Sequence, residues 1–160
     1  MVLLRKSVPQ NHNLKTAAEL GVRHHMNIVQ FGSEAEHVKI EIPESFSLEG
    51  WAQTSVEIKV KGFRGVITPY FNTEDFELFL PNLRKLYESL KGSAEFIPLE
   101  KQLVLTFEGK SGGHISISGT AWSQASYENK LEFSIEIDQS YLQEPLKILE
   151  QLVKQNKSNA

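Results

Sequence analysis

The sequence predicts an α+β protein built on a mostly antiparallel sheet of about six or seven strands, with two amphipathic helices on one face. The short segments that predict strands alternate apolar and polar residues, which is typical of strands buried on one side only, as in antiparallel sheets. Two longer segments repeat their apolar residues every three or four positions, which is typical of helices that cover such a sheet.

Length and composition indicate a soluble globular protein. The chain has 160 residues, of which 23% are charged and 40% hydrophobic, enough for a core. The absence of cysteine excludes disulfides and thiolate metal sites. No apolar run approaches the roughly 20 residues that span a bilayer, and the first residues lack the apolar region of a secretory signal. We therefore expect a cytoplasmic protein that does not enter a membrane.

The net charge changes from positive to negative near residue 25. Residues 1–25 carry +3 and the remaining residues carry −6, against −3 for the whole chain. We expect residues 1–25 to form a loosely attached arm, or an extension before a natural start at Met26, and residues 26–157 to form a single α+β domain. The acidic domain disfavours binding to nucleic acid and favours a basic partner.

Four strands are expected in the first half of the chain, at residues 26–31, 38–42, 56–60 and 66–71. The GFRG sequence at Gly62–Gly65 predicts a tight turn between the last two. Pro69 has no amide hydrogen for a ladder, so the strand at 66–71 is expected at an edge or at a bulge.

Residues 73–92 predict the first helix, because their apolar residues fall on one stripe. Thr73 is expected to cap its first turn, and Gly92 stands where the helix is expected to stop. Pro81 lies within the stripe, so the segment is either one kinked helix or two short ones. The uninterrupted apolar spacing favours the single kinked helix.

Further strands are expected at residues 102–108, 114–122 and 131–137, with residues 94–98 leading into the first of them. Lys110–Gly113 predicts a turn. Asp138 or Ser140 is expected to cap the final helix, with Pro145 in its first turn. The stripe of this helix consists of Leu142, Leu146, Leu149, Leu152 and Val153.

No pattern predicts catalysis, so we expect neither an enzyme nor a cofactor or metal site. The Lys110–His114 segment resembles a phosphate loop or a Ser/His pair, but a strand follows it where a phosphate loop needs a helix. Glu132 and Glu136 have the residue types of a glycosidase pair, yet a solvated acidic face explains them more simply. The five histidines show no ligand spacing. The candidate protein-binding residues on the outward side of the strands are Glu57, Glu108, His114, Glu132 and Glu136.

From residue 58 to 152 the chain resembles small bacterial immunity proteins of the wall-associated-protein (WapI-like) type. The resemblance is carried by Gly62–Gly65, the helix and its exit at Gly92–Ala94, Gly113–Ile115, and Leu131–Leu142. It implies a cytoplasmic protein that binds and neutralises the C-terminal domain of a cognate toxin by direct contact. A basic toxin such as a nuclease would suit the acidic strand surface.

Two other hypotheses come from different classes. A small ligand-binding or enzymatic domain would place His114 beside a carboxylate in a concave pocket. An oligomeric scaffold protein would associate through an exposed edge strand at residues 66–71.

Overall fold

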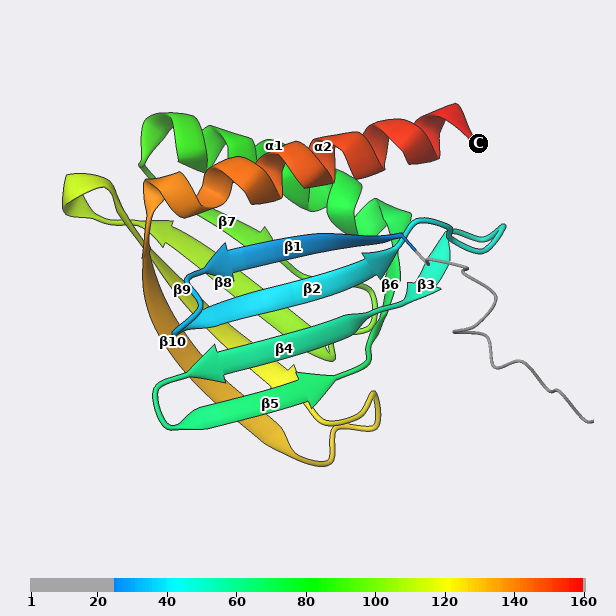
Figure 1. Ribbon diagram of the computed structural model, residues 1–160, viewed down its shortest axis with the longest axis horizontal. Coiled ribbons are helices and arrows are strands. Elements are labelled where there is room, and N and C mark those ends of the chain that lie inside the picture. Colours follow the sequence, from blue (N-terminus) through cyan, green and yellow to red (C-terminus); the bar gives the residue numbers. More distant parts are fainter. Residues whose placement is uncertain (1–24, 160) are drawn as a thin grey trace, which may run out of the picture.

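The computed structural model describes residues 25–159, which form three antiparallel sheets and two helices (Figure 1). Residues 1–24 of the predicted arm lie outside the described residues. The first sheet has the order β1 (Met26–Gly32), β2 (His37–Pro43), β4 (Ser55–Val60) and β5 (Phe63–Ile67). The second has the order β10 (Lys130–Asp138), β9 (His114–Trp122), β8 (Leu103–Gly109) and β7 (Ser93–Phe96). The third pairs β3 (Trp51–Gln53) with β6 (Tyr70–Asn72), and the helices are α1 (Thr73–Ser89) and α2 (Gln143–Ser158).

The core lies between the two four-stranded sheets, which face each other. Phe31 of β1 packs edge-on against Phe107 of β8, with 4.9 Å between the ring centroids. Both helices lie on the same side of the molecule and contact each other, α2 along β1 and α1 along β7 (Figure 1). The predicted α+β class is therefore confirmed. Within residues 25–159, no helix is long and apolar enough to cross a membrane.

The first turn of α1 is capped by Asn72 and not by Thr73, which is the first residue of the helix. The Asn72 side chain accepts a hydrogen bond from the amide of Glu74 at 3.1 Å. In return, Oδ2 of Asp75 accepts one from the amide of Asn72 at 2.7 Å, which completes a capping box. The prediction was one residue late because Asn and Thr are both good caps and the sequence alone does not choose between them.

The helix ends at Ser89, earlier than the predicted stop at Gly92. Leu90 itself takes the left-handed conformation, with φ of 56°, and its amide donates to the carbonyl of Leu86 at 2.8 Å. Gly92 is used instead for the turn into β7. Pro81 lies inside one continuous helix, as the apolar spacing predicts.

The region around Pro69 differs from the prediction in two ways. Phe63 and Arg64 belong to β5, so the turn uses Gly62, with φ of 84°, and not the whole GFRG sequence. The single strand expected at residues 66–71 is divided into β5, which does lie at a sheet edge, and β6. The carbonyl of Pro69, between them, accepts hydrogen bonds from the amide and the hydroxyl of Thr54, both at 2.9 Å.

The second half of the chain follows the predicted order of strands. The Asp138 side chain accepts from the amide of Ser140 at 2.9 Å and caps a short 3-10 turn, Gln139–Leu142, that leads into α2. Pro145 lies in the first turn of α2, as predicted. A second 3-10 turn, Ser111–Gly113, joins β8 to β9. The described strands number ten, more than expected, because β3, β6 and β7, with three or four residues each, are too short for clear alternation.

Candidate protein-binding surface

Most of the predicted binding residues lie on the outer side of the second sheet. The strand register places Glu108 beside Ser116, and Ser116 beside Glu136, while Glu132 lies opposite Thr120. His114 lies opposite Asp138 at the end of the same sheet. We call this surface the acidic face, and its carboxylates, all exposed, belong to Glu95, Glu108, Glu132, Glu136 and Asp138.

The middle of the acidic face is covered by hydroxyl side chains. Thr106, Ser118 and Ser134 lie side by side across β8, β9 and β10. A shallow hollow with a volume of about 240 Å³ lies in this part of the face. Its lining includes Thr120 and Glu132 but not His114. Two lysines pair with acids at the margins of the face: Lys110 with Glu108, at 3.0 Å, and Lys130 with Glu132. Such a broad surface of hydrogen-bonding groups suits contact with another macromolecule.

His114 and Asp138 are the one histidine and carboxylate that meet on this face. The pKa of Asp138 lies below its ordinary value, chiefly because its carboxylate accepts a hydrogen bond from the backbone of Ser140, with a smaller contribution from the charge of His114. Both side chains are exposed on the open surface. The arrangement therefore differs from the concave His114 pocket that the enzymatic hypothesis requires.

Glu57 lies apart from the other four predicted residues. It is on β4, and its side chain points to the outer side of the first sheet, which faces away from the acidic face. The expectation that all five share one surface assumed a single sheet with one wet side. Two sheets packed against each other have two wet sides, and strand alternation alone does not assign a residue to one of them.

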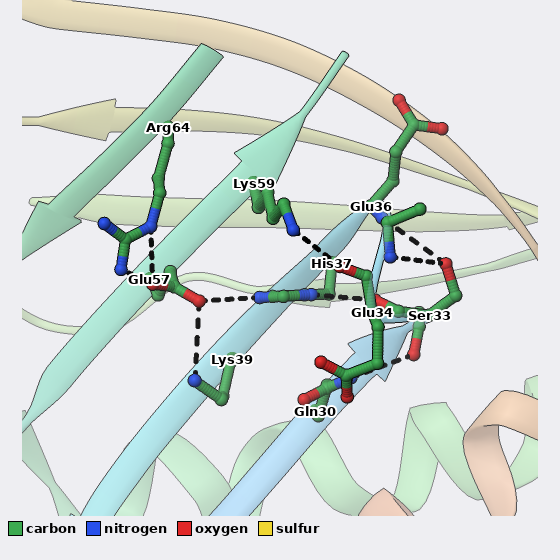
Figure 2. A network of polar contacts seen from close by, with 11 residues as sticks. Gln30, Ser33, Glu34, Glu36, His37, Lys39, Glu57, Lys59 and Arg64 are labelled. Carbon is green, nitrogen blue, oxygen red and sulfur yellow. Dashed lines mark hydrogen bonds and ion pairs between the residues drawn. The ribbon is translucent and has the colours of Figure 1, made fainter. Parts of the chain in front are cut away.

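Glu57 is the centre of a network of ion pairs on the first sheet (Figure 2). Its side chain is 13% exposed, and Oε1 lies 2.8 Å from Nε2 of His37 and 3.4 Å from Nζ of Lys39. Oε2 accepts from Nε of Arg64 at 2.9 Å and also from Nη2. These contacts hold the pKa of Glu57 at about 2, below its ordinary 4.5, with the hydrogen bond from His37 as the largest cause.

Each ring nitrogen of His37 contacts a different oxygen atom. The side chain is only 3% exposed, and Nδ1 lies 2.7 Å from the carbonyl oxygen of Ser33, which can only accept a hydrogen bond. Nε2 faces the ionised carboxylate of Glu57, which is also an acceptor. Through these two contacts, His37 ties the β1–β2 turn to β4.

The same turn is held by further polar contacts (Figure 2). Nζ of Lys59 donates to the carbonyl of Glu34 at 2.8 Å, and Oε1 of Glu36 accepts from the amide of Lys61 at 2.9 Å. The charged groups of this surface thus form intramolecular contacts that hold the turn and the strands together. Sequence reasoning missed the network because His37, Glu57 and Arg64 come from three strands whose order it could not predict. Among residues 25–159, no group of three or more histidines and carboxylates is placed to hold a metal ion.

Comparison with known proteins adds one finding to this geometry. No curated protein and no solved structure matches the chain. The model of the immunity protein WapI-like family matches residues 28–156, which covers nearly all of both four-stranded sheets and of α2. The match extends about thirty residues further toward the N-terminus than the sequence resemblance noted above, and it includes the Glu57 network. The chain therefore belongs to the immunity protein WapI-like family.

Proposed function

We propose that this protein is a non-catalytic, cytoplasmic binding protein that neutralises a cognate toxin domain by direct contact through the acidic face. Membership in an immunity protein family implies a toxin-neutralising role and a toxin partner. The cytoplasmic location, the acidic face as the contact surface and the basic character of the toxin are our proposal.

The distribution of charge is the observation that carries the proposal. Five exposed carboxylates lie on one open sheet surface, and the ion pairs formed there with lysines involve only Glu108 and Glu132 among the described residues. On the first sheet, by contrast, the single carboxylate of Glu57 contacts the side chains of His37, Lys39 and Arg64. Glu95, Glu136 and Asp138 are therefore available to attract a basic partner, such as a nuclease.

The form of the surface favours binding over catalysis. A catalytic site concentrates a nucleophile, a base and an orienting group in a recess that excludes water. The acidic face instead presents Ser and Thr hydroxyls in register, with His114 and Asp138 exposed at one end. Hydroxyls and carboxylates in such a row can accept hydrogen bonds from lysine and arginine side chains across a wide interface.

Co-purification with the C-terminal domain of the toxin encoded beside this protein tests the proposal. We expect a stoichiometric complex at low salt that abolishes the activity of the toxin. Association should slow as salt is raised, because opposite charges steer the encounter. Failure to form a complex at low salt would exclude neutralisation by contact, and an association rate that salt leaves unchanged would exclude the acidic face as the steering surface.

A further inference from the structure

A groove runs between α1 and the free edge of β7, and no role has been assigned to it. It has a volume of about 400 Å³, with Leu78, Phe79 and Asn82 of α1 on one side and Ser93, Glu95 and Ile97 on the other. We call it the α1–β7 groove. β7 is the last strand of the second sheet, so one side of its backbone has no neighbouring strand.

The register shows which backbone groups of β7 face the groove. The amide of Gly109 in β8 donates to the carbonyl of Gly92 at 3.0 Å, just before β7 begins. In an antiparallel pair, hydrogen-bonded and non-bonded positions alternate. Ala94 and Phe96 therefore point their amide and carbonyl groups toward β8, as Gly92 does. The backbone groups directed away from β8 belong to Ser93, Glu95 and Ile97, which line the side of the groove opposite α1.

The margins of the groove carry apolar side chains that water surrounds. Leu78 is 74% exposed, Ile97 50% and Leu99 65%, although each is large and hydrophobic. The amide of Leu99 donates to Oδ1 of Asp75 at 3.0 Å, which fixes Leu99 close to the groove. Unpaired edge groups beside exposed apolar side chains are the two features that accept an extended peptide as an added strand.

The charge of the groove indicates what kind of segment fits. Its lining contains two acidic residues, Asp75 and Glu95, and no basic residue. Both oxygens of Asp75 already accept backbone amides, whereas Glu95 is exposed and also belongs to the acidic face. The groove is therefore continuous with the surface proposed above to bind the toxin, and it complements lysine or arginine side chains.

We propose that the α1–β7 groove binds an extended, basic segment of the toxin domain, which pairs with β7 as a fifth strand of the second sheet. Alternate residues of this segment would contact Leu78 and Ile97, and its lysine or arginine side chains would lie over Glu95. The inference rests on the proposed function, because it names the part of the interface where the toxin backbone is held.

Matched arginine substitutions test the groove in the complex with the toxin domain. Leu78→Arg places a bulky cation on the rim without disturbing the core, because the side chain is exposed. We expect about thirtyfold weaker binding, the loss at which a residue counts as an interface hot spot. Val66→Arg is the control, since Val66 is also exposed on an edge strand, β5, but on the other sheet. We expect binding by the control to remain unchanged.

Amide hydrogen exchange provides the second measurement. The amides of Ser93, Glu95 and Ile97 should exchange fast in the free protein and become protected when the toxin domain binds. Protection already present in the free protein would overturn the proposal. In that case another segment of the chain, or a second copy if protection rises with concentration, occupies the groove.

The outcomes separate this inference from the proposed function. If the unaltered protein forms no complex, the proposed function fails and the groove proposal fails with it. If the complex forms but Leu78→Arg binds as tightly as the unaltered protein, only the groove proposal fails. Weaker binding by Val66→Arg with normal binding by Leu78→Arg would also overturn it and would indicate β5 as the edge that pairs.

Discussion

Nε2 of His37 lies 2.8 Å from Oε1 of Glu57, and this contact joins a buried histidine at the start of β2 to a carboxylate on the adjacent strand β4. Because Nδ1 of the same ring contacts the carbonyl of Ser33, His37 connects the β1–β2 turn to the Glu57 network on β4.

Stability should depend on pH through Glu57. Its pKa in the folded protein, about 2, lies below the ordinary 4.5, so the unfolded chain binds the proton more readily. The stabilisation is therefore fully present above about pH 5 and is lost as the pH falls toward 2. Glu57→Gln should flatten the dependence of the unfolding free energy on pH in this window. Urea unfolding at several pH values measures it, and parallel curves for the two proteins would contradict the assignment.

Replacing His37 with Phe should destabilise the protein by about 1–3 kcal/mol, because the Ser33 carbonyl and Glu57 each lose a buried polar partner. His114→Phe is the matched control, since His114 is exposed, and should change stability by less than about 0.5 kcal/mol. Equal unfolding midpoints for the two variants in urea would show that the His37 contacts contribute nothing net.

Asn72→Ala should cost about 1 kcal/mol or somewhat more, because it removes the side-chain cap of α1 and a hydrogen bond to the carbonyl of Glu49. Thr73→Ala, at the position that sequence reasoning favours as the cap, should cost much less. Chemical denaturation of both variants decides which residue caps the helix. A larger loss at Thr73 would reverse the assignment.

Gly119→Ala should destabilise the protein by about 1–3 kcal/mol through overpacking. A Cβ at Gly119 would lie 2.3 Å from Cζ of Phe133 and 2.9 Å from Cδ2 of Leu105, so the aromatic ring must move. Gly65→Ala is the control, because no atom lies within 4 Å of its added Cβ and its φ is not positive. Thermal unfolding of the two variants should differ clearly, and a tolerated Gly119→Ala would mean that the ring of Phe133 shifts at little cost.

Charge reversal on the acidic face should slow association with the toxin domain. The double variant Glu95→Lys and Glu136→Lys should reduce the association rate constant about tenfold at low salt and change dissociation less, as expected for steering charges. The double variant Glu88→Lys and Glu144→Lys, with exposed reversals on α1 and α2, is the control because it changes the net charge by the same amount. Stopped-flow kinetics measures both rates. An equal effect of this control would indicate that net charge, and not the acidic face, governs the encounter.

The sequence predicted the elements well because each has a local signature. Alternation located β1, β2, β4, β8, β9 and β10, and the apolar stripe located α1 across Pro81 despite the lost backbone bond. These signals depend only on which side of an element is buried. They carry no information about which strands are neighbours, since that depends on contacts between residues far apart in the chain.

The candidate site was predicted only in part for the same reason. Glu108, His114, Glu132 and Glu136 share one face because β8, β9 and β10 follow each other in the sequence and in the sheet. Glu57 was assigned to the same face because alternation marks its side chain as exposed to solvent. Each of two packed sheets has its own solvent-facing side, and alternation does not tell which of the two a residue occupies. The α1–β7 groove could not be predicted at all, since it requires knowing that β7 ends its sheet beside α1.

The Glu57 network and the acidic face lie on the outer sides of the two sheets, which face opposite directions with the core between them. In the proposed function, the network that holds the fold and the surface that would contact the toxin lie on opposite exteriors of one small protein. During evolution, the carboxylates of the acidic face could therefore be substituted as the toxin changes. The Glu57 network on the other sheet would stay intact, so the fold would be kept.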